Sequence, residues 1–167
     1  MSSAKPLASA QRLIETDQAD AAIVGGIDTL CAMTLRGFKS LEALSSEAAR
    51  PFSAERRGLN IGEGGAFLLL ERTGEPIALL EAVGESSDAH HISAPDPDGA
   101  GARLAMERAL ALAGVPASSV DHVNAHGTGT RLNDLAEADA IRALFGDLPV
   151  WVSSTKPATG HLVAAAG

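Results

Sequence analysis

Two histidines stand in glycine- and threonine-containing loops, each a short distance after an apolar run. His126 belongs to Asn-Ala-His-Gly-Thr-Gly-Thr (124–130), and His161 ends Ser-Thr-Lys-Pro-Ala-Thr-Gly-His (154–161). Neutral imidazoles that donate N–H groups toward one oxygen stabilise negative charge developing there, by several kcal/mol where water is excluded. A single histidine at a strand end is more often an ordinary loop residue, but the pair of similar loops favours a site.

A zinc site is a poor alternative for these two histidines. Neither has a cysteine or a carboxylate nearby at the spacing of metal ligands. His90 and His91 are adjacent in an extended connection, so their side chains would point to opposite faces, and both are left out of the candidate site. His122 is expected to be a surface residue. No metal is expected.

The elements that position the loops alternate between helix and strand, which is typical of an α/β sheet. Helices are predicted over about 3–17, 33–44, 102–113 and 134–145, and strands over 19–24, 65–70, 77–83, 120–125 and 150–154. Ser3 is the predicted N-cap of the first helix, and Asp134 that of the last, with Glu137 completing a capping box. The strands before His126 and His161 deliver both loops to a sheet edge, where α/β folds bind ligands.

The two histidine loops resemble the catalytic loops of the β-ketoacyl synthases, the condensing enzymes of fatty acid and polyketide assembly. Four further segments fit the family's order: Gly-Gly-Ile-Asp (25–28), Arg-Pro-Phe (50–52), Gly-Glu-Gly-Gly (62–65) and the closing residues 160–167. The resemblance implies a thiolase-like layered αβαβα fold, here incomplete. Residues 1–92 would end its first half, and residues 93–167 would begin its second. One departure is Arg-Arg-Gly-Leu (56–59), where the family usually has Arg-Asp-Gly-Phe.

The resemblance also implies roles for site residues. His126, His161, Lys156 and Glu137 match the family's catalytic positions, and an ion pair between Lys156 and Glu137 would orient the pocket. The alternative for Glu137 is a solvated helix residue.

Two further positions come from the same resemblance. Thr128 and Thr130 match the pair that contacts the pantetheine arm; the alternative is simple turn chemistry. The family's nucleophilic cysteine would stand immediately before Met1. The chain is therefore expected to be an internal fragment that is inactive alone. Cys31 is expected to be buried packing.

Composition restricts the class of protein. The 167 residues are 46% hydrophobic and 20% charged, with a net charge of −8, which argues against nucleic acid binding. No apolar run reaches membrane-spanning length, and one cysteine fits a reducing compartment, so a cytoplasmic protein is expected. A basic cluster is the candidate docking surface for an acidic carrier protein: Arg36, Lys39, Arg50, Arg56 and Arg57. Solvated loop charges are the alternative.

The expected function is that of a β-ketoacyl-acyl carrier protein synthase, which condenses an acyl thioester with malonyl-acyl carrier protein in fatty acid biosynthesis. No cofactor is expected beyond the phosphopantetheine arm of the acyl carrier protein, and the full-length protein is expected to be a homodimer. A polyketide or polyene ketosynthase is the alternative within the enzyme class. A non-catalytic subunit that sets chain length is the other alternative, against which the presence of His126, Lys156 and His161 argues.

Overall fold

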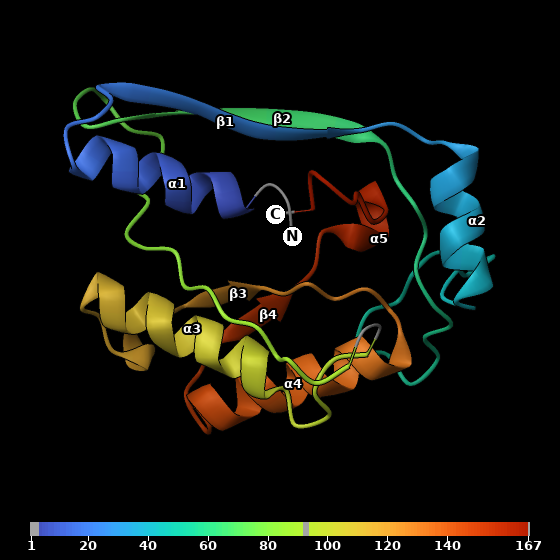
Figure 1. Ribbon diagram of the computed structural model, residues 1–167. Helices are drawn as coiled ribbons and strands as arrows, with labels where there is room; N and C mark the ends of the chain where they lie inside the picture. Colours follow the sequence, from blue (N-terminus) through green and yellow to red (C-terminus); the bar gives the residue numbers. More distant parts are fainter. Residues whose placement is uncertain (1–3, 92–93, 167) are drawn as a thin grey trace.

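The computed structural model describes residues 4–91 and 94–166. Its first layer is an antiparallel pair, β1 (Ala21–Asp28) and β2 (Gly64–Glu71), in which Val24 faces Leu68 across the ladder. Helix α1 (Ala4–Glu15) lies beneath this pair in Figure 1 and buries Ala8, Ala10 and Ile14. Helix α2 (Ala32–Ser40) follows β1 at one end of the layer.

The second layer carries both histidine loops. Strands β3 (His122–Asn124) and β4 (Trp151–Ser153) are parallel and lie beside α3 (Ala100–Ala113) and α4 (Arg131–Phe145). A 3₁₀ turn, η1 (Ala117–Ser119), precedes β3, and the short helix α5 (Lys156–Thr159) follows β4. In Figure 1, α5 lies between the two layers.

The core of the second layer is small and apolar. Ala125, Ile141 and Phe145 form its buried cluster. The small residues of α4 allow a close approach by the segment that enters α3, because a Cβ on Gly99 would lie 3.0 Å from the Ala140 methyl group. Because the side chains at these contacts are small, the elements of the layer pack closely. Burial of apolar groups stabilises the layer.

Most predicted elements are confirmed, with ends shifted by a few residues. The predicted strand 77–83 is wrong: those residues have no regular structure, and Ile77 and Leu79 are 106% and 73% exposed. A strand needs a neighbour to satisfy its backbone groups, and no strand within residues 4–91 and 94–166 pairs with this run. The predicted cap at Ser3 and the expected boundary at 92–93 lie outside the described residues.

The described part of the chain contains no helix that is both long and apolar enough to cross a membrane. Its two sheets have two strands each, one antiparallel and one parallel. This mixed α/β arrangement agrees with the expected fold class, with sheets smaller than a complete layered fold would have.

Candidate active site

The rings of His126 and His161 meet edge to face, with centroids 5.2 Å apart and planes at 88°. His161 is 9% exposed, and His126 is partly buried. Phe38 of α2 also packs near His161, with ring centroids 5.9 Å apart and planes at 47°. The structure thus brings together the two histidines that the sequence singled out.

Parallel pairing of β3 with β4 brings their loops to one edge. The pairing continues past the strands, because Ala125 donates its N–H to the Ser153 carbonyl at 2.7 Å. The Ser154 hydroxyl then donates to the carbonyl of Gly127 at 3.1 Å. Gly127 has φ +43°, and a Cβ there would lie 2.6 Å from the Ser154 Cβ, so only glycine fits this contact.

A segment from the first layer fixes the backbone at His161. The His161 N–H donates to the Asn60 carbonyl at 2.6 Å, and the Gly62 N–H donates to the His161 carbonyl at 3.1 Å. The Asn60 side chain holds its own loop, since its Oδ1 accepts the Ala49 N–H at 2.8 Å. The glycine turn at 62–65 therefore serves a close approach between layers.

Glu137 lies on α4 with its carboxylate turned toward the His126 loop. It accepts the backbone N–H groups of His126 at 2.6 Å and Gly127 at 2.8 Å. The capping-box prediction is therefore wrong, because the carboxylate binds the loop before the helix. No direct ion pair to Lys156 is formed among the described residues; Glu137 acts on the buried Lys156 through its charge, which favours the ammonium.

Asp134 is a site residue whose role the sequence did not indicate. Its side chain is 1% exposed and accepts the N–H groups of Phe52 at 2.7 Å and Gly129 at 3.1 Å. The guanidinium of Arg56 lies 3.8 Å from it. Asp134 is not the helix N-cap, since Thr130 occupies that position. Its carboxylate instead ties the His126 loop to the first layer.

Burial decides the charge state of the site. Burial first, and the positive charge of Lys156 second, lower the pKa of His126 from 6.5 to about 4. Burial and Lys156 also lower the pKa of His161. The pKa of Lys156 is itself lowered by burial, an effect that the Glu137 carboxylate opposes. Both imidazoles are therefore neutral at pH 7, beside a buried amine.

Thr128 and Thr130 occupy the turn between His126 and α4. Their hydroxyls lie 2.8 Å apart, and the Thr130 N–H donates to the Thr128 hydroxyl at 3.3 Å. Thr128 is 4% exposed. The hydroxyls pair with each other here, and their proposed contact with a pantetheine arm stays a prediction.

The remaining candidates lie elsewhere. His90 faces Asp96 at 3.7 Å, and exposed His122 bonds the Ser153 hydroxyl at 2.8 Å. Cys31 is only half-buried and caps α2 by accepting the Thr34 N–H, so its assignment to buried packing is wrong. Its pKa is lowered by the hydrogen bonds to Thr34.

The expected basic cluster is largely paired with acids. Arg50 bonds Glu55 at 2.6 Å, Arg57 faces Glu47 at 3.6 Å, and Arg56 is directed inward to Asp134. Arg36 and Lys39 are exposed on α2. The arginines beyond α2 therefore offer less free positive charge than their number suggests.

A cavity of about 730 Å³ opens beside the His126 loop. Its walls include His126, Glu137, residues 83–88 and the first residues of α1, Ala4 and Lys5. The start of α1 therefore faces the same space as the candidate site. No group of three histidine, cysteine or carboxylate side chains is gathered for a metal within residues 4–91 and 94–166.

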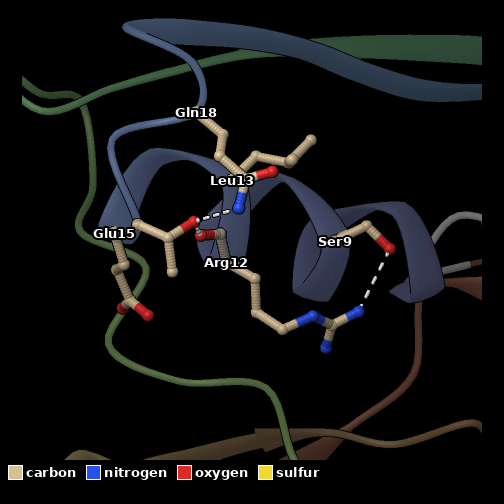
Figure 2. Close-up of a pocket in the computed structure, with 6 residues that line it drawn as sticks. Ser9, Arg12, Leu13, Glu15 and Gln18 are labelled. Carbon is tan, nitrogen blue, oxygen red and sulfur yellow. Dashed lines mark hydrogen bonds between the residues drawn. The ribbon is translucent and has the colours of Figure 1, made fainter.

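A second hollow, on the exposed side of α1, is unrelated to the histidines. It is lined by Ser9, Arg12, Leu13, Glu15, Thr16 and Gln18. Figure 2 shows the Arg12 guanidinium directed to the Ser9 hydroxyl, to which it donates at 3.4 Å. The Thr16 hydroxyl donates to the Arg12 carbonyl at 2.7 Å. The hollow has no pair of ionisable groups suited to acid–base chemistry.

Comparison with known proteins matches the whole arrangement to one family. The family model for the "Beta-ketoacyl synthase, N-terminal domain" matches residues 2–75, and the model for the "Beta-ketoacyl synthase, C-terminal domain" matches residues 77–167. The mitochondrial 3-oxoacyl-[acyl-carrier-protein] synthase of Arabidopsis thaliana is 42% identical, over 98% of this chain and 40% of that protein. The chain thus spans about two fifths of the length of the curated relatives it matches.

Two solved structures show the same fold. A chain from the complex of a ketosynthase with its chain length factor from Xenorhabdus doucetiae is 51% identical, with a TM-score of 0.92 over 99% of this chain and 41% of that chain. A chain from the complex of a type II PKS acyl-carrier protein with its ketosynthase bound to the hexaketide is 31% identical, with a TM-score of 0.92 over 98% of this chain and 44% of that one. The fold is therefore that of the thiolase-like ketosynthases, as expected.

Proposed function

Because the chain belongs to the β-ketoacyl synthase family, we propose that it is part of a β-ketoacyl-acyl carrier protein synthase, an acyltransferase of fatty acid biosynthesis. A thiolate attacks the carbonyl of an acyl thioester, and the carrier thiolate leaves. A malonyl thioester then loses CO2, and the electron pair of the broken carbon–carbon bond forms an enolate. The enolate carbon attacks the acyl carbonyl and releases the enzyme thiolate.

The observation that supports this proposal is the buried edge-to-face pair of His126 and His161. The enolate carries negative charge on the thioester oxygen, and two neutral N–H donors stabilise that charge more where water is scarce. The lowered pKa values keep both rings neutral at pH 7. In this proposal Lys156 maintains their neutrality through its positive charge, and Glu137 holds the His126 backbone.

The nucleophile is proposed to be a cysteine in a segment before Met1. The cavity supports this, since the first residues of α1 and His126 line the same space. A thiol carried just ahead of α1 would face the histidines. The isolated 167-residue chain should then give no condensation product; turnover by the purified chain would refute this assignment.

The proposal extends to partners. Thr128 and Thr130 are proposed to exchange their mutual hydrogen bond for amide groups of the pantetheine arm. The substrates would arrive on an acyl carrier protein, with no resident cofactor, and the full-length enzyme would act as a homodimer in the cytoplasm. Within the basic cluster, the exposed side chains of Arg36 and Lys39 are proposed to meet an acidic carrier.

A polyketide or polyene ketosynthase is the second candidate. One observation favours it: identity to the chain from the ketosynthase and chain length factor complex is 51%, against 42% for the mitochondrial synthase. In that case the partner would be a chain length factor in place of a second copy. Two measurements on the purified full-length protein separate the candidates. The mass of the assembly distinguishes a homodimer from a complex with a chain length factor, and the products formed from malonyl-carrier protein distinguish fatty acid from polyketide synthesis.

The central test is decarboxylation of malonyl-carrier protein by the full-length enzyme. His126→Ala and His161→Ala should each slow it about a hundredfold or more, the usual cost of removing an oxyanion donor. His90→Ala serves as the control, because His90 faces Asp96 far along the chain from either loop. An equal loss in His90→Ala would contradict the choice of histidines.

A further inference from the structure

Asp28 stands at the carboxyl end of β1, where the first layer meets the segment that follows His161. β1 and β2 are paired there, with Asp28 opposite Gly64. A Cβ on Gly26 would lie 2.8 Å from the Ala164 carbonyl oxygen, so the backbone of β1 nearly touches this segment. Asp28 therefore reaches residues far from it in sequence.

One oxygen of the Asp28 carboxylate accepts two backbone N–H groups. Ala164 donates at 2.7 Å and Ala165 at 2.8 Å, across 136 and 137 residues of chain. Bonds of this kind to an ionised acceptor are about twice as strong as those between neutral groups. The segment after His161 is thus fixed to the end of β1.

The backbone before the segment has its own support. Asn60 and Gly62 bond the N–H and carbonyl of His161 itself. The chain is consequently held at His161 itself and again three and four residues later. The Nδ1 atom of His161 is buried and has no hydrogen-bond partner, so side-chain bonds through that nitrogen do not fix the ring.

We propose that Asp28 is a positioning residue for His161, which holds the imidazole against His126 by binding the backbone of residues 164–165. The charge of Asp28 also acts on the ring: it favours the protonated imidazole, against burial and the positive charge of Lys156. The other ionisable group against the ring is His126. The kinetic consequence rests on the proposed function, whereas the structural consequence does not.

Three variants of the full-length enzyme test this role: Asp28→Ala, Asp28→Asn and, as the matched control, Asp20→Ala. Asp20 is an exposed aspartate at the opposite end of β1. Three quantities are measured: decarboxylation of malonyl-carrier protein, acylation of the nucleophile, and the pKa of His161 from NMR of labelled histidine. Acylation is included because the proposed mechanism does not use His161 in that step.

Asp28→Ala should slow decarboxylation about tenfold to a hundredfold, as expected for a misplaced group, and leave acylation within about twofold. Asp28→Asn should recover most of the rate, because its amide oxygen still accepts the two N–H groups. Both variants should lower the His161 pKa further, because the carboxylate charge is gone.

Two results would overturn the positioning role. In one, Asp28→Ala matches Asp20→Ala in all three measurements. In the other, acylation and decarboxylation fall together, with no change at His161. If the enzyme decarboxylates no malonyl thioester but the His161 pKa shifts more in Asp28→Ala than in Asp28→Asn, which loses the same charge, the positioning role stands and the proposed function fails.

Discussion

The carboxylate of Asp134 accepts the backbone N–H of Phe52 at 2.7 Å, although 82 residues of chain separate the two. The same carboxylate accepts the Gly129 N–H and lies 3.8 Å from Arg56. One buried acid therefore connects the His126 loop, α4 and the loop between α2 and β2. The relative placement of the two layers at the site depends on this group.

Replacing Asp134 by Ala should destabilise the full-length protein by about 3–5 kcal/mol, because two backbone donors lose their acceptor and the largely buried guanidinium of Arg56 loses the opposite charge beside it. Chemical denaturation measures the change in the free energy of unfolding. The control is Asp139→Ala on the same helix, whose exposed pair with Arg142 should contribute less than about 1 kcal/mol. Equal losses in the two variants would contradict the role of Asp134.

Replacing Gly127 by Ala should reduce both stability and decarboxylation. The residue has φ +43°, which costs an alanine about 1–2 kcal/mol, and the new methyl would overlap the Ser154 Cβ. Adding Ser154→Gly should recover only the steric part.

The matched control for Gly127 is Gly37→Ala in α2. No atom lies within 4 Å of a Cβ there, and alanine favours a helix interior by about 0.5–1 kcal/mol. Thermal unfolding and decarboxylation rates of both variants check the comparison. Equal stability of Gly127→Ala and Gly37→Ala would contradict the claim that a side chain at position 127 collides with Ser154.

The low pKa of His126 links stability to pH. An unfolded histidine binds a proton below about pH 6.5, whereas folded His126 binds one only near pH 4. Between these values the unfolded state binds more protons, so the free energy of unfolding should fall as the pH decreases from about 6.5 to 4, by up to about 3 kcal/mol. Denaturation of the wild type and of His126→Ala at several pH values measures this, and the variant should lose that part of the slope. An unchanged slope would mean that His126 titrates normally.

The positions of His126 and His161 were predictable because each follows a strand, and parallel strands end at one edge. The residues that hydrogen-bond the backbone of these two loops were not predictable from the sequence. Glu137 and Asp134 fit a helix start by local spacing, and that local explanation was wrong, since tertiary packing turned both carboxylates toward the preceding loop. Asn60 gave no sequence signal at all: its contact with His161 arises from the meeting of two layers.

The fold shows the same division between local and distant causes. The runs that became β1 and β2 were found from their apolar residues and glycine boundaries, and each has the other as a partner. The run 77–83 has similar composition, but no neighbouring strand within the described residues supplies hydrogen bonds. Cys31 was predicted to be buried from its residue type alone, but it lies at the start of α2, where its side chain caps the helix.

The face of β1 and β2 turned away from α1 is apolar and exposed. Side chains alternate along a strand, so that Val24 is buried while Ile23, Ile27, Phe67 and Leu69 are 76%, 59%, 63% and 62% exposed. Contiguous apolar surface of this kind promotes association. The isolated 167-residue chain should therefore form oligomers and bind a hydrophobic dye, with a loosely packed structure and a broad melting transition.

The cross-strand pair Ile23 and Leu69 allows a matched test, because Ile23→Lys with Leu69→Glu places opposite charges on that face and should reduce both dye binding and oligomer mass. Sedimentation and dye fluorescence compare the wild-type chain with the double variant. A monodisperse wild-type monomer with a sharp melting transition and no dye binding would show that this face does not drive association and that these residues fold independently.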